Sequence, residues 1–128
     1  MGATATMLTK KFCQRVIETW INSDVSQFDA LYSLDITGMI NQEISLSYSD
    51  IKNRFLYTGA HNTNREFEIK EILIEDNKAA LFFRYTAYDT KLQQAINAPT
   101  LWIFTIEQEK ICHVEILTSL QFNYHDKA

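Results

Sequence analysis

The sequence is poor in glycine, proline and cysteine. Its 128 residues include 3 glycines, 1 proline and 2 cysteines, too few for a collagen-like repeat, a flexible linker or a disulfide scaffold. It also lacks an excess of basic residues, since 12 Lys and Arg stand against 16 Asp and Glu, a formal net charge of −4. Because phosphate backbones and anionic lipid surfaces are bound by clustered Lys and Arg, we expect neither nucleic acid nor a membrane as a partner.

Long apolar runs are also missing. No stretch approaches the roughly 18 apolar residues of a membrane-spanning helix. Residues 1–6 are small and polar, without the basic and apolar regions of a signal peptide. Cys13 and Cys112 lie far apart in two apolar patterns, which is typical of buried, reduced thiols. We therefore expect a cytoplasmic protein.

Apolar and aromatic residues are present in the amounts that a folded domain needs. They make up 46% and 12% of the chain, enough for one hydrophobic core and too much for a disordered chain. We therefore expect a single domain over residues 1–128, with mobile ends at about 1–6 and 123–128.

Helical periodicity dominates the first part of the chain. Apolar residues recur at spacings of three and four between residues 8 and 21, and a shorter stripe follows between 25 and 32 after the polar break Asn22-Ser23-Asp24. The pattern then changes to alternation over 36–41, which predicts a short strand. Two helices joined by a tight turn are therefore expected to precede the first strand.

A third helix is expected over about 49–58. The side chains of residues 47–50 offer acceptors for free backbone N–H groups at its start. Gly59 is expected to end it in a left-handed turn. The polar residues 61–64 then predict a loop before the first long strand.

The second half of the chain is typical of strands. Extended runs are expected at 65–75, 79–90, 100–107 and 110–120. Helices followed by long antiparallel strands indicate an α+β domain with the helices packed on one face of a curved sheet.

Three local patterns resemble the NTF2-like superfamily, in particular its SnoaL-like and ketosteroid-isomerase-like members. They are Asp24 with Asp29-Ala30-Leu31-Tyr32, the run from Tyr48 to Phe55, and Trp102-Ile103-Phe104-Thr105-Ile106 followed by Lys110-Ile111. The resemblance implies three N-terminal helices on a strongly curved, mainly antiparallel sheet that forms a cone. It also implies a small apolar ligand in the mouth of the cone and dimerisation through the sheet.

The resemblance also identifies the positions at which an isomerase of this superfamily carries its ionisable groups. The base position falls at Ile40 or Asn41, the tyrosine position at Val16 and the oxyanion acid at Trp102. An aliphatic side chain or a neutral amide cannot abstract a proton. The ketosteroid-isomerase catalytic set is therefore absent from these positions.

Glu71 is one candidate for a lyase, isomerase or cyclase activity. It lies in the apolar alternation of Phe67, Ile69 and Leu73, where desolvation would raise the pKa of a carboxyl group toward neutrality. The alternative is a strand-edge residue that is solvated or paired with Arg84.

His113 and Glu115 form the second candidate. They share one face of the last strand, as an acid and a base would, but the same spacing is typical of a hydrogen-bonded strand histidine with an exposed partner. Because two residues on one strand supply only two ligands, we expect no metal. We expect no cofactor either.

An apolar ligand pocket is the third and leading possibility. The residues expected to border it or to lie near its mouth are Trp102, Tyr85, Phe82, Asn41, Tyr57, His61 and Arg84. Trp102 either enlarges the apolar lining or fills the cone. A filled cone would favour a protein-interaction module that binds through the sheet or the cone rim. Whether the chain is an enzyme stays open.

Two strand segments are apolar on both faces. In 81–85 and 101–106, neither alternating set of side chains is distinctly polar. Since a sheet with one solvated face alternates cleanly, we expect the second face to be covered as well. The sequence therefore predicts a homodimer that forms through the sheet.

Overall fold

Three helices and six strands occupy residues 10–120, the part of the chain that this computed structural model describes. The helices are α1 (Lys10–Asn22), α2 (Val25–Leu31) and α3 (Tyr48–His61). The strands are β1 (Tyr32–Ile40), β2 (Ile44–Leu46), β3 (Asn62–Glu75), β4 (Lys78–Asp89), β5 (Gln94–Glu107) and β6 (Lys110–Thr118). The mobile ends expected at about 1–6 and 123–128 lie outside the described residues.

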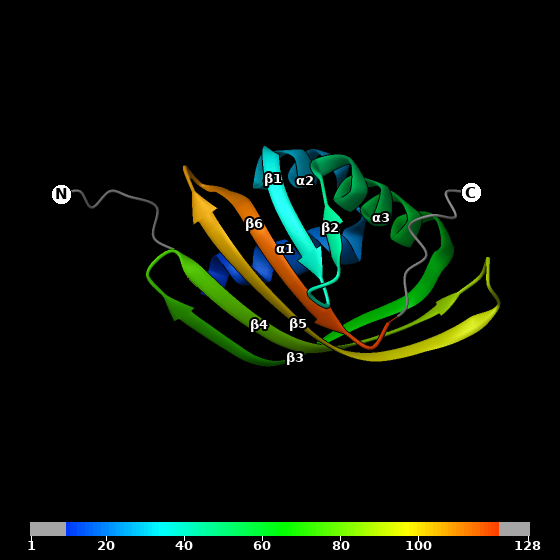
Figure 1. Cartoon of the computed structure of the whole chain (residues 1–128). Coiled ribbons are helices and arrows are strands. Elements are labelled where there is room, and N and C mark those ends of the chain that lie inside the picture. Colours follow the sequence, from blue (N-terminus) through cyan, green and yellow to red (C-terminus); the bar gives the residue numbers. More distant parts are fainter. Residues whose placement is uncertain (1–9, 121–128) are drawn as a thin grey trace.

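The strands form one curved sheet in the order β2-β1-β6-β5-β4-β3. The pair β1 and β6 runs parallel, and the other neighbouring pairs run antiparallel. Figure 1 shows the three helices gathered on one side of this sheet, where α1 contacts β3 and α3 contacts β1, β2 and β3. The structure confirms the α+β cone that the sequence predicts, with β2 and β3 as its two edges.

Burial along β4 distinguishes the two faces of the sheet. Leu81 and Phe83 are at most 1% exposed, whereas Phe82 between them is 42% exposed. Successive side chains of a strand point to opposite faces. We call the face that packs against the helices the inner face and the opposite one the outer face.

The start of α3 matches the sequence, but its end does not. Ser47 caps the helix and forms a reciprocal capping box with Asp50. The helix continues through Gly59 to His61, and no described glycine has a positive φ angle, so the predicted turn at Gly59 is wrong. The predicted loop at 61–64 is also wrong, because Asn62 pairs with Asp89 at the start of β3.

The first and fifth strands are longer than the sequence patterns indicate. β1 begins directly after α2 and pairs with β6. β5 begins at Gln94 and therefore contains Pro99. Because β6 ends at Thr118, which pairs with Thr100, the preceding part of β5 has no neighbouring strand on that side among residues 10–120. A proline is tolerated there, since an edge requires no ladder hydrogen bond from its nitrogen.

Candidate functional site

A cavity of about 70 Å³ lies between the inner face of the sheet, α1 and α3. Aromatic and aliphatic side chains provide most of its lining, and Arg54 is the charged residue among the described residues that line it. Pockets for drug-sized ligands usually hold roughly 300 Å³ or more. The cone is therefore largely filled but retains a small internal space.

Trp102 is the main reason that the space is small. Its ring packs against Phe83 at 4.8 Å, Trp20 at 5.5 Å and Phe67 at 6.3 Å between centroids. These rings come from β4, α1 and β3. The indole therefore lines the cavity and also fills part of the cone, which combines the two alternatives that the sequence left open.

Two tyrosine hydroxyls belong to the cavity wall. The hydroxyl oxygen of Tyr32 accepts a hydrogen bond from Trp20 Nε1 at 2.9 Å, and that of Tyr85 accepts one from Asn62 Nδ2 at 2.7 Å. Burial raises the pKa of both phenols. Both groups therefore remain protonated at neutral pH.

Three threonines, Thr58, Thr100 and Thr118, also belong to the polar part of the lining. The hydroxyl groups of Thr100 on β5 and Thr118 on β6 form a hydrogen bond with each other, with 2.9 Å between their oxygens. The Thr118 oxygen also accepts from the backbone N–H of Leu120 at 3.1 Å. The hydroxyls of Thr100 and Thr118 are bonded to each other and to nearby backbone.

A larger and more polar groove of about 370 Å³ shares Arg54 and Leu120 with the cavity. The hairpin between β4 and β5 and the residues after β6 provide much of its lining. Because two residues belong to both spaces, the groove adjoins the cavity.

The structure places Trp102 and Tyr85 in the cavity lining. Phe82 is not there, because Phe83 and Tyr85 occupy the inner face and strand alternation directs Phe82 outward. The position expected for Phe82 at the pocket is therefore wrong. That Trp102 and Tyr85 bind a ligand stays a prediction.

The other residues expected near the mouth, Asn41, Tyr57 and His61, do not line the cavity. The amide of Asn41 extends the β1–β6 pairing by accepting from Thr118 N at 2.9 Å and donating to Thr118 O at 3.1 Å. Tyr57 donates its hydroxyl hydrogen to Asp89 at 2.8 Å, and its ring packs against that of His61 in a tilted arrangement, with 4.6 Å between centroids.

Arg84 lies on the outer face of β4. Its Nη1 donates to Asn97 Oδ1 on β5 at 2.7 Å. Because Phe83 and Tyr85, its neighbours along β4, face inward, the Arg84 guanidinium lies on the side of the sheet opposite the cavity.

Glu71 lies on the outer face, opposite the expected apolar side. The β3–β4 register shifts between Ile69 and Glu71, so that Ile69 pairs with inward-facing Phe83 but Glu71 pairs with outward-facing Phe82. One extra residue in a strand reverses the alternation that follows it. The placement of Glu71 on one face with Phe67 and Ile69 is therefore wrong.

His113 and Glu115 share the outer face of β6. His113 Nε2 lies 2.7 Å from Glu115 Oε2, and His113 Nδ1 lies 2.6 Å from Thr37 Oγ1. The imidazole is thus held between a carboxylate and a hydroxyl, but on the side of the sheet that faces away from the cavity. His113 and Glu115 therefore form the expected pair, but they do not face the internal cavity.

The sequence patterns overlooked several lining residues that they contain. Thr100 precedes Trp102 by two positions on β5, so strand alternation places both on the inner face. Arg54 follows Ile51 by three positions and shares its helical face. Asn62, which does not line the cavity but donates to the lining residue Tyr85, had no such signal, because it was predicted to lie in a loop.

No helix within residues 10–120 is long and apolar enough to span a membrane. Both cysteines are free thiols. Burial raises the pKa of Cys13 to about 11, so this thiol stays protonated and unreactive at neutral pH.

No protein-family model and no curated protein matches this sequence, but solved structures share its fold. AclR of Streptomyces galilaeus, a candidate hydroxylase, has a TM-score of 0.75 and 17% identity over 85% of this chain and 77% of its own. A candidate SnoaL-like polyketide cyclase from Shewanella denitrificans OS-217 has a TM-score of 0.75 and 10% identity over 86% and 89% of the two chains.

A third structure, a hypothetical protein from Catenulispora acidiphila DSM 44928 in complex with trimethylamine, is described as having a ketosteroid isomerase-like fold. It has a TM-score of 0.69 and 13% identity over 85% of both chains. At such identities the likeness establishes the fold. The chain has the NTF2-like fold of SnoaL-like and ketosteroid-isomerase-like proteins, which confirms the resemblance in its sequence.

Proposed function

We propose that the chain binds a small, largely apolar molecule in the cavity between the sheet and the helices. The observation that carries this proposal is an internal space that aromatic rings line and that a few polar groups border. Ligand sites typically combine these two features. The fold supports the same reading, because it is shared with candidate polyketide cyclases.

The cavity volume limits the ligand. A space of about 70 Å³ suits a molecule of a few heavy atoms rather than a drug-sized one. A longer ligand would place its apolar part in the cavity and extend past Arg54 and Leu120 into the adjoining groove.

Binding without catalysis is the form of the proposal that the lining favours. The described residues that line the cavity include no Asp, Glu or His, the side chains that usually abstract a proton. Glu71, His113 and Glu115 lie on the outer face. An enzyme that uses them inside the cone is not part of this proposal.

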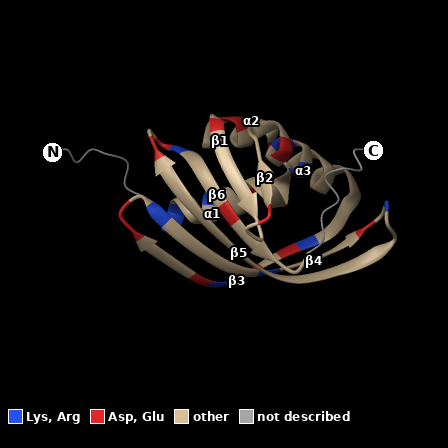
Figure 2. Ribbon diagram, in the orientation of Figure 1, with Lys and Arg blue, Asp and Glu red and all other residues tan. Residues whose placement is uncertain are grey.

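A second copy of the chain is the proposed partner of the outer face. The apolar side chains that form an outer-face patch are Leu73, Phe82, Leu101, Ile103 and Leu117. Phe82 pairs with Leu101, which pairs with Leu117, so three adjacent strands contribute one row. Figure 2 shows that charges are scarce along β5, where Glu107 at its end is the charged residue. Such a patch is unusual on a monomer surface.

A reducing, cytoplasmic setting accompanies the proposal. The two described cysteines, Cys13 and Cys112, are free thiols, as is usual for proteins of the cytoplasm.

A cavity-filling substitution tests the binding proposal. Ile116 lines the cavity from β6, and Ile116→Phe adds a ring to that space. We expect methylenecyclopentane to shift the NMR signals of cavity-lining residues in the wild type. The variant should weaken this binding at least 10-fold, because the ring occupies the volume that the probe needs.

The control is Ile103→Phe, which makes the same change on the outer face of the neighbouring strand. This variant should bind the probe as the wild type does. Absence of binding in the wild type, or equal binding by Ile116→Phe, would contradict the proposed function.

A further inference from the structure

β5 extends past the end of β6 and leaves one edge open. Its pairing with β4 is regular from Gln94 to Thr105, whereas its pairing with β6 stops at Thr100 and Thr118. Among residues 10–120, the part of β5 from Gln94 to Pro99 therefore has a neighbouring strand on one side only. An open edge presents backbone N–H and C=O groups with which a further strand can pair.

Hydrogen bonds at the end of β6 show which backbone groups of β5 point to this edge. The backbone N–H and C=O of Thr118 both bond on the β1 side of β6. Because backbone groups alternate in direction along a strand, those of Leu117 point to its pair on β5, Leu101. The same alternation along β5 directs the N–H and C=O groups of Asn97 and Ala95 to the open edge.

Pro99 interrupts the pairing of β5 with β6. It lies two positions from Leu101, so its nitrogen points to the same edge. Proline has no N–H, and Ser119 therefore lacks one ladder hydrogen bond. The strand β6 ends one residue earlier, at Thr118. Beyond the proline, the edge again carries backbone donors as well as acceptors.

The chain leaves the described residues at this edge. Leu120 lines the groove beside the open part of β5, and it lines the cavity as well. Beyond it the sequence alternates, since Phe122 is aromatic and its neighbours Gln121 and Asn123 are polar, a pattern that is typical of a half-buried strand. Side chains two positions apart on a strand share a face, so an extended segment would direct Phe122 inward.

We propose that residues 121–123, which lie outside the described part of the chain, continue β6 as a strap that pairs with residues 95–97 of β5. Continued past Thr118, the register of the two strands places Phe122 opposite Ile96. The residues on either side of Phe122 exchange backbone hydrogen bonds with the groups that the open edge presents. Because Phe122 points inward, the strap covers the groove, and a ligand longer than the cavity enters the groove only when the strap opens.

A cross-strand disulfide tests the register. In this register Ile96 and Phe122 exchange no backbone hydrogen bonds, and the Cα atoms of such a pair lie close enough for a disulfide. Ile96→Cys with Phe122→Cys should oxidise to a disulfide within one chain, which peptide mapping by mass spectrometry distinguishes from bonds to Cys13 or Cys112. The control pair, Ile96→Cys with Asn123→Cys, directs its side chains to opposite faces and should form roughly 10-fold less disulfide. Equal yields for the two pairs, or a bond between two chains, would overturn the strap.

Amide hydrogen exchange of the full chain gives a second readout. The N–H of Asn97 should exchange about 10-fold faster in Phe122→Asp than in the wild type, because a carboxylate that faces the groove releases the strap. Asn123→Asp is the matched control, since it places the same charge on the outward side and should exchange as the wild type does. The N–H of Ile96 points to β4 and is the internal reference. Equal exchange of Asn97 in all three proteins would contradict the pairing.

Ligand binding tests the closure of the groove. Phe122→Asp should bind 5-cyclopentylpentan-1-ol about 5-fold more tightly than the wild type, because no strap has to open first. Both proteins should bind methylenecyclopentane alike, since this probe stays in the cavity. Equal affinity of the two proteins for the longer probe would contradict the closure. If neither probe binds either protein, the proposed function fails, whereas the disulfide and exchange measurements still decide whether the strap forms.

Discussion

Asp89 is a buried carboxylate that joins α3 to the hairpin between β4 and β5. Its Oδ2 accepts from the Tyr57 hydroxyl at 2.8 Å, and its Oδ1 accepts from the backbone N–H groups of Lys91 and Leu92 at 2.9 Å each. Burial opposes the ionisation of this carboxyl, but the hydrogen bonds from Leu92, Tyr57 and Lys91 outweigh it and hold the pKa of Asp89 below its ordinary value. The charged form is therefore part of the folded structure.

We expect Asp89→Asn to lower the free energy of unfolding by about 1–3 kcal/mol, since hydrogen bonds to a charged acceptor are lost or weakened. Urea unfolding at neutral pH measures the change. Asp76→Asn, in the turn between β3 and β4, is the control and should stay within about 0.5 kcal/mol of the wild type. A wild-type unfolding curve for Asp89→Asn would contradict this account.

At the scale of single residues, the sequence predicted lining residues only where alternation was intact. Trp102 and Tyr85 lie in regular strands. Each shares the inner face with the residue two positions away, Phe104 and Phe83 respectively. Glu71 was misplaced because a bulge depends on the partner strand as well as on the strand itself.

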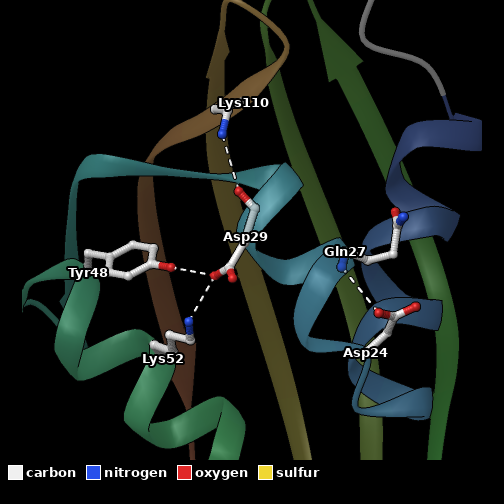
Figure 3. A network of polar contacts seen from close by, with 6 residues as sticks. All are labelled: Asp24, Gln27, Asp29, Tyr48, Lys52 and Lys110. Atoms are coloured by element: carbon white, nitrogen blue, oxygen red, sulfur yellow. Dashed lines mark hydrogen bonds and ion pairs between the residues drawn. The ribbon is translucent and has the colours of Figure 1, made fainter.

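At the scale of the elements, a polar network holds α2 against α3 and the start of β6. Figure 3 shows Asp29 of α2 accepting from the Tyr48 hydroxyl at 2.6 Å and from Lys52 Nζ at 2.9 Å. Lys110 Nζ donates to the backbone oxygen of Asp29 at 3.2 Å. The hydrogen bonds from Tyr48 and Lys52 lower the pKa of Asp29 from its ordinary 3.8.

This network predicts an acid-dependent contribution to stability. A carboxyl group whose pKa is lower in the folded state than in the unfolded state stabilises the fold above the unfolded value. The contribution of Asp29 should therefore be complete above about pH 5 and decline as the pH falls below 3.8. Asp29→Asn should be less stable than the wild type at pH 7, and the difference should shrink at acid pH.

Urea unfolding of both proteins between about pH 2.5 and about pH 7, a range that spans the titration of this carboxyl group, measures the difference. Asp76→Asn is again the control and should run parallel to the wild type. A stability difference for Asp29→Asn that stays constant over the whole pH range would contradict the account.

At the scale of the whole molecule, the outer-face patch is the reason that we expect a homodimer. Phe82 lies at its centre, 42% exposed and paired with Leu101 on one side and Glu71 on the other. Burial of this patch against a second copy would remove apolar surface from water, at roughly 25 cal/mol per Å².

Phe82→Glu should convert the proposed dimer into a monomer. The new carboxylate would stand beside Glu71 and would have to lose its hydration at the interface, which is unfavourable. Light scattering should give twice the mass of one chain for the wild type and the mass of one chain for the variant.

The control is Leu56→Glu, which changes a similarly exposed leucine, 46% exposed on α3. It should remain dimeric. A monomeric wild type at micromolar concentration would refute the proposed assembly, and dimers of both variants would place the interface elsewhere.

The sequence by itself determined the class of the fold and most of its helices and strands. Helical and alternating spacings arise from local geometry, since side chains repeat every 3.6 residues in a helix and every 2 in a strand. The same spacings therefore predicted α1, the start of α3 and the presence of β4, but not which side of β4 faces inward, since Phe82 and Tyr85 were both expected at the pocket. The lack of glycine, proline and basic residues excluded whole classes of protein for compositional reasons that folding does not alter.

Only the tertiary structure decided the size of the cavity, the position of Glu71 and the state of the Tyr85 hydroxyl. The 70 Å³ cavity is the small remainder after Trp102 and its neighbours pack, and such a remainder depends on every contact around it. The bond between Asn62 and Tyr85 joins residues 23 positions apart. Contacts of this kind form when strands pair, so local sequence patterns carry no record of them.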